Sequence, residues 1–179
     1  MSQGMSVDTR RFRNALGQFP TGVTVITTVT AQGERLGMTV SSFNSLSLDP
    51  PLVLFSIRKQ SGSIAAWREV AHYAINVLSE EQEDVSARFA KPGGEQWAGQ
   101  VLTGRSGVPL LPHAAVIFEC EAYGRYDGGD HEIFVGRVVE LHENAAKHGR
   151  PLVFAGGRYR KLHSGEVHVP VEAYFPHGW

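Results

Sequence analysis

A long β-hairpin is predicted by residues 115–142, which read AVIFECEAYGRYDGGDHEIFVGRVVELH. Its two strands are expected at roughly 115–126 and 131–142. Between them, Asp127-Gly128-Gly129-Asp130 supplies the positive φ that a tight hairpin requires. Extended structure is therefore expected to dominate this part of the chain.

Five further segments predict strands. Residues 23–29, VTVITTV, are β-branched at every position, and a turn at 32–34 separates them from the next strand, so the pair predicts a second hairpin. Asp49-Pro50-Pro51 removes two backbone donors before a strand that is apolar at nearly every residue and is expected to be central and buried. The five strands are 23–29, 36–43, 52–57, 72–78 and the short 152–155.

The N-terminal segment predicts a helix that Asp8 or Thr9 can cap. Its apolar residues fall at the i, i+3, i+4, i+7 spacing of one helical face, namely Phe12, Ala15, Leu16 and Phe19. Pro20 and Gly22 then end the helix.

Two shorter helices are predicted within the strand-rich region. Ser61-Gly62-Ser63 precedes residues 64–70, IAAWREV, where a hydroxyl can accept from the first free backbone N–H groups. Ser79, with Gln82 three residues later, predicts a capping box for a helix that runs through Phe89.

Strands outnumber helices in this order, so the expected fold class is mainly β, a closed or split β-barrel with peripheral α-helices. Residues 91–113 are rich in Gly and Pro and are expected to form an irregular excursion, either a lid or a subunit contact. No GxGxxG follows a first strand and no GxxxxGK[ST] occurs, so a Rossmann fold and a P-loop are not expected.

Length and charge exclude several classes of protein. A chain of 179 residues fits one domain. Lys plus Arg is 17 and Asp plus Glu is 18, a balance that argues against nucleic-acid or anionic-membrane binding. Cys120 is the only cysteine, which favours a reducing, cytoplasmic location. No apolar run of membrane-spanning length and no signal segment is present, so no membrane association is expected.

Small polar side chains in residues 37–45, GMTVSSFNS, occupy a strand end that the flanking apolar runs would bury. Buried polar groups need partners. Two interpretations remain open, because these groups could pair with backbone or could form a wall of donors and acceptors for a planar heterocycle.

Hydroxyls and cations elsewhere in the sequence also allow two interpretations, a structural role or the binding of a phosphate. Ser61 and Ser63, with Arg58 just before them, could bind a phosphate as well as cap a helix. Arg88, at a helix end, is by default a solvated cation but could also reach a phosphate.

His131 follows Asp130 at the mouth of the long hairpin, where a histidine is most often only a polar loop residue. A hydrolytic triad is rejected because no GxSxG elbow exists. The other histidines show no HExxH or similar spacing, so a metal site is not expected.

Five motifs occur in order along the chain: FRNALGQFPTGVTVITT (12–28), GMTVSSFNSLSLDPPLVLFSI (37–57), INVLSEEQEDVSARFA (75–90), GGDHEIFVGRVVEL (128–141) and PLVFAGGRYRKL (151–162). Together they resemble the short-chain flavin reductases, the reductase components of two-component flavin-dependent monooxygenases. The resemblance spans roughly residues 10 to 162 and implies a flavin-reductase-like split β-barrel that works as a homodimer.

The resemblance also implies two binding sites. The stretch that lines the flavin ring and ribityl chain matches Thr39, Val40, Ser41 and Ser42. The region of the flavin phosphate matches Ser56, Arg58, Ser61 and Ser63, and the pair that closes the same site matches Arg88 and Phe89. The motif beside the nicotinamide pocket matches Gly129, Asp130 and His131, and the late aromatic residue near it matches Tyr159.

The expected function is that of an NAD(P)H:flavin oxidoreductase, which reduces FMN or FAD by direct hydride transfer and supplies it to a separate monooxygenase. The alternative is a non-catalytic flavin carrier or sensor on the same barrel, and a pyridoxamine-phosphate-type oxidase is a weaker one. The choices between FMN and FAD and between NADH and NADPH stay open. The expected organisation is a tail at 1–9, the reductase domain at 10–162 and an extension at 163–179.

Overall fold

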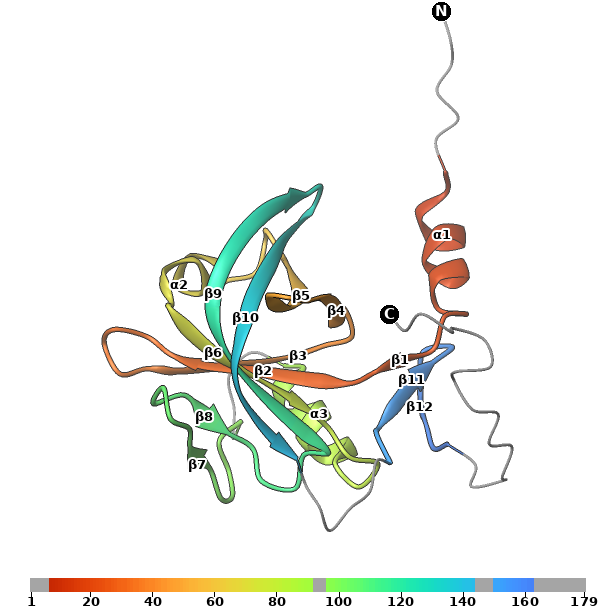
Figure 1. Cartoon of the computed structure of the whole chain (residues 1–179). Coiled ribbons are helices and arrows are strands. Elements are labelled where there is room, and N and C mark those ends of the chain that lie inside the picture. Colours follow the sequence, from red (N-terminus) through yellow and green to blue (C-terminus); the bar gives the residue numbers. More distant parts are fainter. Residues whose placement is uncertain (1–6, 92–95, 144–149, 163–179) are drawn as a thin grey trace, which may run out of the picture.

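A seven-stranded antiparallel sheet forms the body of the computed structural model, which describes residues 7–91, 96–143 and 150–162. The strand order is β3-β2-β6-β9-β10-β5-β4, and the sheet curls on itself (Figure 1). The strands are β2 (Thr24–Val29), β3 (Arg35–Val40), β4 (Asn44–Leu48), β5 (Pro51–Arg58), β6 (His72–Val77), β9 (Val116–Gly128) and β10 (His131–Glu143). The expected mainly β architecture is confirmed.

Both predicted hairpins are present. β9 and β10 pair from His131 opposite Gly128, and Gly129 has the positive φ of 77° that the turn requires. β2 and β3 pair antiparallel around a turn in which Gly33 has a φ of 81°. β10 also pairs with β5, and this register places Arg58 opposite His131.

Short elements surround the sheet. They are α1 (Thr9–Leu16), α2 (Ile64–Glu69), α3 (Glu83–Phe89), β1 (Thr21–Gly22), β7 (Leu102–Thr103), β8 (Pro109–Leu110), β11 (Val153–Ala155) and β12 (Arg158–Arg160). β1, β11 and β12 form a separate small sheet, from which α1 projects (Figure 1). No helix among the described residues is both long and apolar enough to cross a membrane.

An aromatic cluster fills the core of the curled sheet. Phe55 stacks on Phe134 with ring centroids 5.3 Å apart, and the rings of Tyr73 and Trp67 meet Phe55 edge-on at 5.2 and 6.2 Å. All four side chains are buried. Aromatic pairs in these geometries add to the free energy of apolar burial, so the cluster holds β5, β6, β10 and α2 together.

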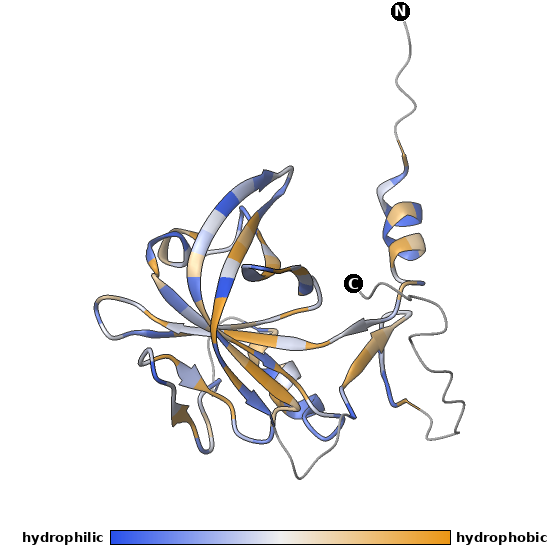
Figure 2. Ribbon diagram, in the orientation of Figure 1, coloured by the Kyte–Doolittle hydropathy of each residue, from blue (hydrophilic) through white to orange (hydrophobic). Residues whose placement is uncertain are grey.

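The first helix differs from expectation at its end. The Asp8 carboxylate accepts from the backbone N–H of Arg11 at 2.7 Å and caps α1 as predicted. The helix ends at Leu16 rather than at Phe19, and its apolar residues are exposed, with Phe12 54% and Leu16 58% accessible. Figure 2 shows hydrophobic and hydrophilic residues side by side on this helix.

Two local predictions need correction, and one strand was missed. No side-chain hydrogen bond caps α2, so the hydroxyls of Ser61 and Ser63 are not helix caps. The Gln82 side chain accepts from the backbone N–H of Ser79 at 3.0 Å, as in a capping box, but this pair forms a turn and α3 begins only at Glu83. β4 was not predicted, because NSLSL alternates polar residues with exposed leucines and forms a strand only by pairing with β5.

Strand β5 lies between β10 and β4, as expected, but it buries only alternate residues, Val53, Phe55 and Ile57. The described part of 91–113 contains only the short strands β7 and β8, in agreement with an irregular excursion. The division into tail, domain and extension stays a prediction: α1 begins at Thr9, and 163–179 lie outside the described residues.

Candidate functional site

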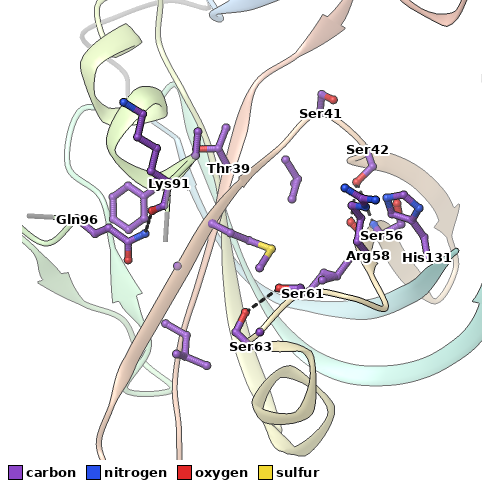
Figure 3. A pocket seen from close by; sticks show the side chains of 18 of the residues that line it. Thr39, Ser41, Ser42, Ser56, Arg58, Ser61, Ser63, Lys91, Gln96 and His131 are labelled. Carbon is purple, nitrogen blue, oxygen red and sulfur yellow. Dashed lines mark hydrogen bonds between the residues drawn. The ribbon is translucent and has the colours of Figure 1, made fainter. Parts of the chain in front are cut away.

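A cleft of about 890 Å³ opens between β3, the C-terminal end of β5, the start of α2 and the end of α3 (Figure 3). This volume is within the range of small-molecule and cofactor sites. The predicted site residues that line it are Thr39, Val40, Ser41, Ser42, Ser56, Arg58, Ser61, Ser63, Phe89 and His131. Residues from three of the five motifs, together with Arg58, Ser61 and Ser63, are thus brought to one surface.

Two hydroxyls in the β3 region form hydrogen bonds with backbone groups. Thr39 Oγ1 donates to the carbonyl of Ser86 at 2.7 Å. Ser42 Oγ accepts from the backbone N–H of Ser56 at 3.0 Å and lies 3.2 Å from its carbonyl. Backbone pairing, one of the two readings left open by the sequence, therefore holds for these two residues. Ser41 is exposed at the rim of the same wall (Figure 3).

The hydroxyls before α2 face the cleft. Ser61 Oγ lies 3.2 Å from Ser63 Oγ, and neither hydroxyl bonds to the helix backbone (Figure 3). Arg58, at the end of β5, is exposed and lines the cleft beside them. Two hydroxyls and one guanidinium at one end of a cleft can bind a phosphate through hydrogen bonds that are partly charge-assisted.

His131 enters the cleft from the first position of β10. Its Nδ1 lies 2.7 Å from Asp130 Oδ1. This hydrogen bond, with the electrostatic attraction of His131 and of Arg58, holds the pKa of Asp130 below its usual value. Because an ionised carboxylate can only accept, Nδ1 carries the hydrogen and Nε2 is the free ring nitrogen.

Three predicted residues do not line the cleft. Asp130 is exposed and contacts it only through His131. Arg88 donates to the carbonyl of Ala98 at 2.9 Å and lies 3.7 Å from Asp84, on the other side of α3. Tyr159 Oη lies 2.8 Å from Ser86 Oγ, so its link to the cleft runs through Ser86 and Thr39.

Sequence reasoning also missed residues of the cleft. Lys91 and Gln96 line it at the end of α3, within or beside a Gly- and Pro-rich stretch that carried no readable pattern. Gly37 lies within one of the five motifs but was not predicted as a site residue. A Cβ at this position would lie 2.5 Å from the Phe89 ring, so only glycine allows Phe89 to pack against β3. The remaining lining residues that were not predicted are Glu34, Arg35, Leu36, Met38, Ile57, Gln60, Gly62 and Ala90.

Comparison with known proteins gives consistent results. A family model for the flavin reductase like domain matches residues 16–163. The FMN reductase (NADH) SmoA of Agrobacterium fabrum is 46% identical over 155 residues, which cover 87% of each chain. The reductase subunit HsaB of a flavin-dependent monooxygenase from Rhodococcus jostii is 43% identical over 155 residues, covering 86% of this chain and 78% of that protein.

A solved structure extends the likeness to the fold. The NADH:FAD oxidoreductase SgcE6 of Streptomyces globisporus, in complex with NAD and FAD fragments, superposes with a TM-score of 0.81. The two sequences are 34% identical, and the match covers 90% of this chain and 99% of that chain.

Proposed function

This chain belongs to the flavin reductase-like domain family, and we propose that it works as an NAD(P)H-dependent flavin reductase whose flavin and nicotinamide both bind in the cleft beside β3. The predicted family and the split-barrel fold class are confirmed by the family match and the structural superposition. The relatives are named as reductases, which favours an enzyme over a non-catalytic flavin carrier.

The observation that carries this proposal is the meeting of Arg58, Ser61 and Ser63 with His131 in one cleft. The first three are suited to a flavin phosphate, and His131 lies opposite Arg58 through the pairing of β5 with β10. A flavin anchored by its phosphate at this end would extend its ring along β3, past Thr39 to Ser42. The second ligand would then reach His131 from the same opening.

Hydride transfer between nicotinamide C4 and flavin N5 is chemistry that the two ligands supply when bound. The role of the protein is to hold them in contact at the right angle and to limit water. Ser42, tied to Ser56, keeps the chain after β3 in place, so that the backbone N–H groups near Ser41 and Ser42 can face negative charge on the reduced ring. Asp130 orients His131, whose Nε2 can contact the carboxamide or phosphates of the nicotinamide substrate.

Steady-state assays test this function directly. Oxidation of NADH and NADPH is measured on the purified protein with added riboflavin, FMN and FAD. Catalytic oxidation with at least one flavin is expected, and the comparison also identifies the preferred flavin and nicotinamide. Binding of flavin without any nicotinamide oxidation would contradict the proposal and favour the carrier.

The flavin is proposed to be a diffusible substrate whose reduced form is passed to a separate monooxygenase. The likeness to a monooxygenase reductase subunit supports this role. Nucleic acid and membranes are not part of the proposal, and a cytoplasmic location stays the expectation for the chain with its single, buried Cys120.

A homodimer is proposed from the resemblance to the family and from one further observation. Phe12, Leu16 and Phe19 near α1 and Leu46 and Leu48 on the edge strand β4 are exposed large apolar side chains. A second copy of the chain could bury these two groups of side chains, since exposed apolar side chains can mark interaction sites. Light scattering should give twice the monomer mass, and a monomer at micromolar concentration would contradict the proposal.

A further inference from the structure

Among the described residues, three cations of the cleft form no ion pair with a carboxylate. The side chains of Arg35, Arg58 and Lys91 all line the cleft, and none makes a hydrogen bond or ion pair within the described residues. Every other lysine and arginine described between residues 21 and 150 lies within 3.9 Å of a carboxylate oxygen. These paired cations are Lys59, Arg68, Arg88, Arg105, Arg125, Arg137 and Arg150.

The unpaired cations lie at two ends of the cleft. Arg58 is at the end of β5, beside Ser61 and Ser63, whereas Arg35 begins β3 and Lys91 follows α3. Figure 3 shows Lys91 and Gln96 on one side of the cleft and Arg58 and His131 on the opposite side. A single mononucleotide phosphate placed at Arg58 therefore leaves a second positive region without a counter-charge.

The second region is built around a stack of side chains. The guanidinium carbon of Arg35 lies 5.8 Å from the ring centroid of Trp97. Trp97 meets the Phe89 ring edge-on at 5.0 Å, and Phe89 packs where Gly37 has no Cβ. Stacking on an indole fixes the plane of a guanidinium and leaves its N–H edge available, which suits bidentate contact with phosphate oxygens.

We infer that Arg35 and Lys91 form a second anion-binding subsite, which takes the ADP moiety of a dinucleotide whose other half lies at the Arg58 end of the cleft or beside it. This inference rests on the proposed function. FAD and NADH both carry an ADP moiety, and the pyrophosphate is the group that the two cations recognise. A mononucleotide, FMN or reduced nicotinamide mononucleotide, lacks this group and cannot use the subsite.

The double variant Arg35→Gln/Lys91→Gln tests the subsite in two arms. The first arm measures equilibrium binding of FAD and FMN by flavin fluorescence, without nicotinamide. The second arm measures KM for NADH and for reduced nicotinamide mononucleotide at saturating flavin. Loss of charge-assisted hydrogen bonds should raise the Kd or KM of the dinucleotide about tenfold or more in one arm, while the value for the corresponding mononucleotide changes little. The arm that responds identifies FAD or NADH as the source of the ADP moiety.

Controls separate a local effect from a general one. Arg105→Gln removes an exposed cation of the β7–β8 loop that does not line the cleft. It should leave unchanged both the ratio of FAD to FMN affinity and the ratio of the KM values for NADH and reduced nicotinamide mononucleotide. Arg35→Lys keeps the charge but loses the planar fork, so an intermediate loss is expected. Both target side chains are exposed, so the melting temperature of each variant should match that of the wild type.

The outcomes distinguish the subsite from the function. Equal effects on dinucleotide and mononucleotide in both arms would overturn the subsite, even if the wild type reduces flavin. A wild-type protein that oxidises no nicotinamide with any flavin would overturn the proposed function. Equilibrium binding of FAD and FMN, and of NADH and reduced nicotinamide mononucleotide, to wild type and double variant would then still decide whether the subsite exists.

Discussion

Ser61 Oγ and Ser63 Oγ lie 3.2 Å apart, and neither hydroxyl bonds to the backbone of the helix that they precede. Serine before a helix ordinarily contributes a cap. Here the two hydroxyls instead line the cleft together with Arg58. Their lack of a capping partner is the structural reason to assign them to a ligand.

The double variant Ser61→Ala/Ser63→Ala should therefore weaken the binding of FMN more than the binding of riboflavin, because riboflavin has no phosphate. Loss of one or two hydrogen bonds to a charged group is worth about 1.5–3 kcal/mol, or roughly 10- to 150-fold in Kd. Fluorescence titration with both flavins measures the ratio. Ser45→Ala, on the exposed strand β4, is the matched control. Equal losses for the two flavins would return these serines to a structural role.

His131→Ala should raise KM for the nicotinamide substrate more than it changes flavin affinity. The proposed contacts of the imidazole are to the second ligand, and such a contact is worth about 1–3 kcal/mol, or roughly 5- to 150-fold. Asp130→Asn is expected to raise the same KM by a smaller factor, because Asp130 orients His131 and does not line the cleft. A collapse of flavin binding with an unchanged nicotinamide KM would show that His131 belongs to the flavin site.

The sequence predicted the strands well where local pattern and tertiary environment agree. The run of β-branched residues at 23–29 became β2 in a buried hairpin, and the turn at Gly129 formed where glycine is needed. β4 escaped prediction, because NSLSL is short, leaves both of its leucines exposed in the chain and depends on β5 for its hydrogen bonds. Propensity cannot reveal a strand that only pairing creates.

The site was predicted by motif and not by geometry. Nothing local indicates that Arg58 and His131 are neighbours, since only the register of β5 with β10 brings them together. Arg88 and Phe89 are adjacent in the chain, yet successive residues on a helix point in different directions, so Phe89 lines the cleft and Arg88 contacts Ala98. Lys91 and Gln96 became visible only in the structure, because their segment has no periodicity to interpret.

A buried carboxylate predicts how stability depends on pH. Glu119 is fully buried, and it accepts from His142 Nε2 at 2.7 Å and from the backbone N–H groups of Arg105 and Ser106 at 3.1 and 3.2 Å. Burial alone would raise the pKa of Glu119, but the hydrogen bonds of His142 and of the two N–H groups outweigh it, and the net pKa lies below the usual value of 4.5.

A lowered carboxyl pKa stabilises the folded state above the unfolded pKa and loses this contribution as pH falls through the folded pKa. Stability to urea should therefore decline below about pH 4.5. Glu119→Gln should lower the free energy of unfolding at neutral pH by about 1–3 kcal/mol and flatten the decline. Glu140→Gln, which removes a surface partner of Arg105, should change stability by less than about 1 kcal/mol. Identical acid profiles for wild type and Glu119→Gln would refute this account.

The rate of flavin exchange sets the affinity that the cleft can have for reduced flavin. If reduced flavin leaves for a separate monooxygenase on every cycle, its dissociation rate must at least match turnover, about 10 s⁻¹ for a median enzyme. With an association rate of about 10⁶ M⁻¹s⁻¹, the dissociation constant of the reduced form is on the order of 10 μM. This affinity corresponds to about −7 kcal/mol, which a few hydrogen bonds and partial burial of the ring can provide.

The cleft is compatible with such weak binding, because Arg58, Ser41 and Lys91 along its rim are exposed to solvent. Purified protein should therefore lose much of its flavin on desalting and should need added flavin to oxidise NADH. Absorbance at the flavin maximum before and after dialysis, with turnover measured on the same samples, tests both points. Protein that stays yellow and stoichiometric through dialysis, and that oxidises NADH without added flavin, would hold its flavin as a fixed group. Electrons would then have to leave by another route, and transfer by diffusion of reduced flavin would be wrong.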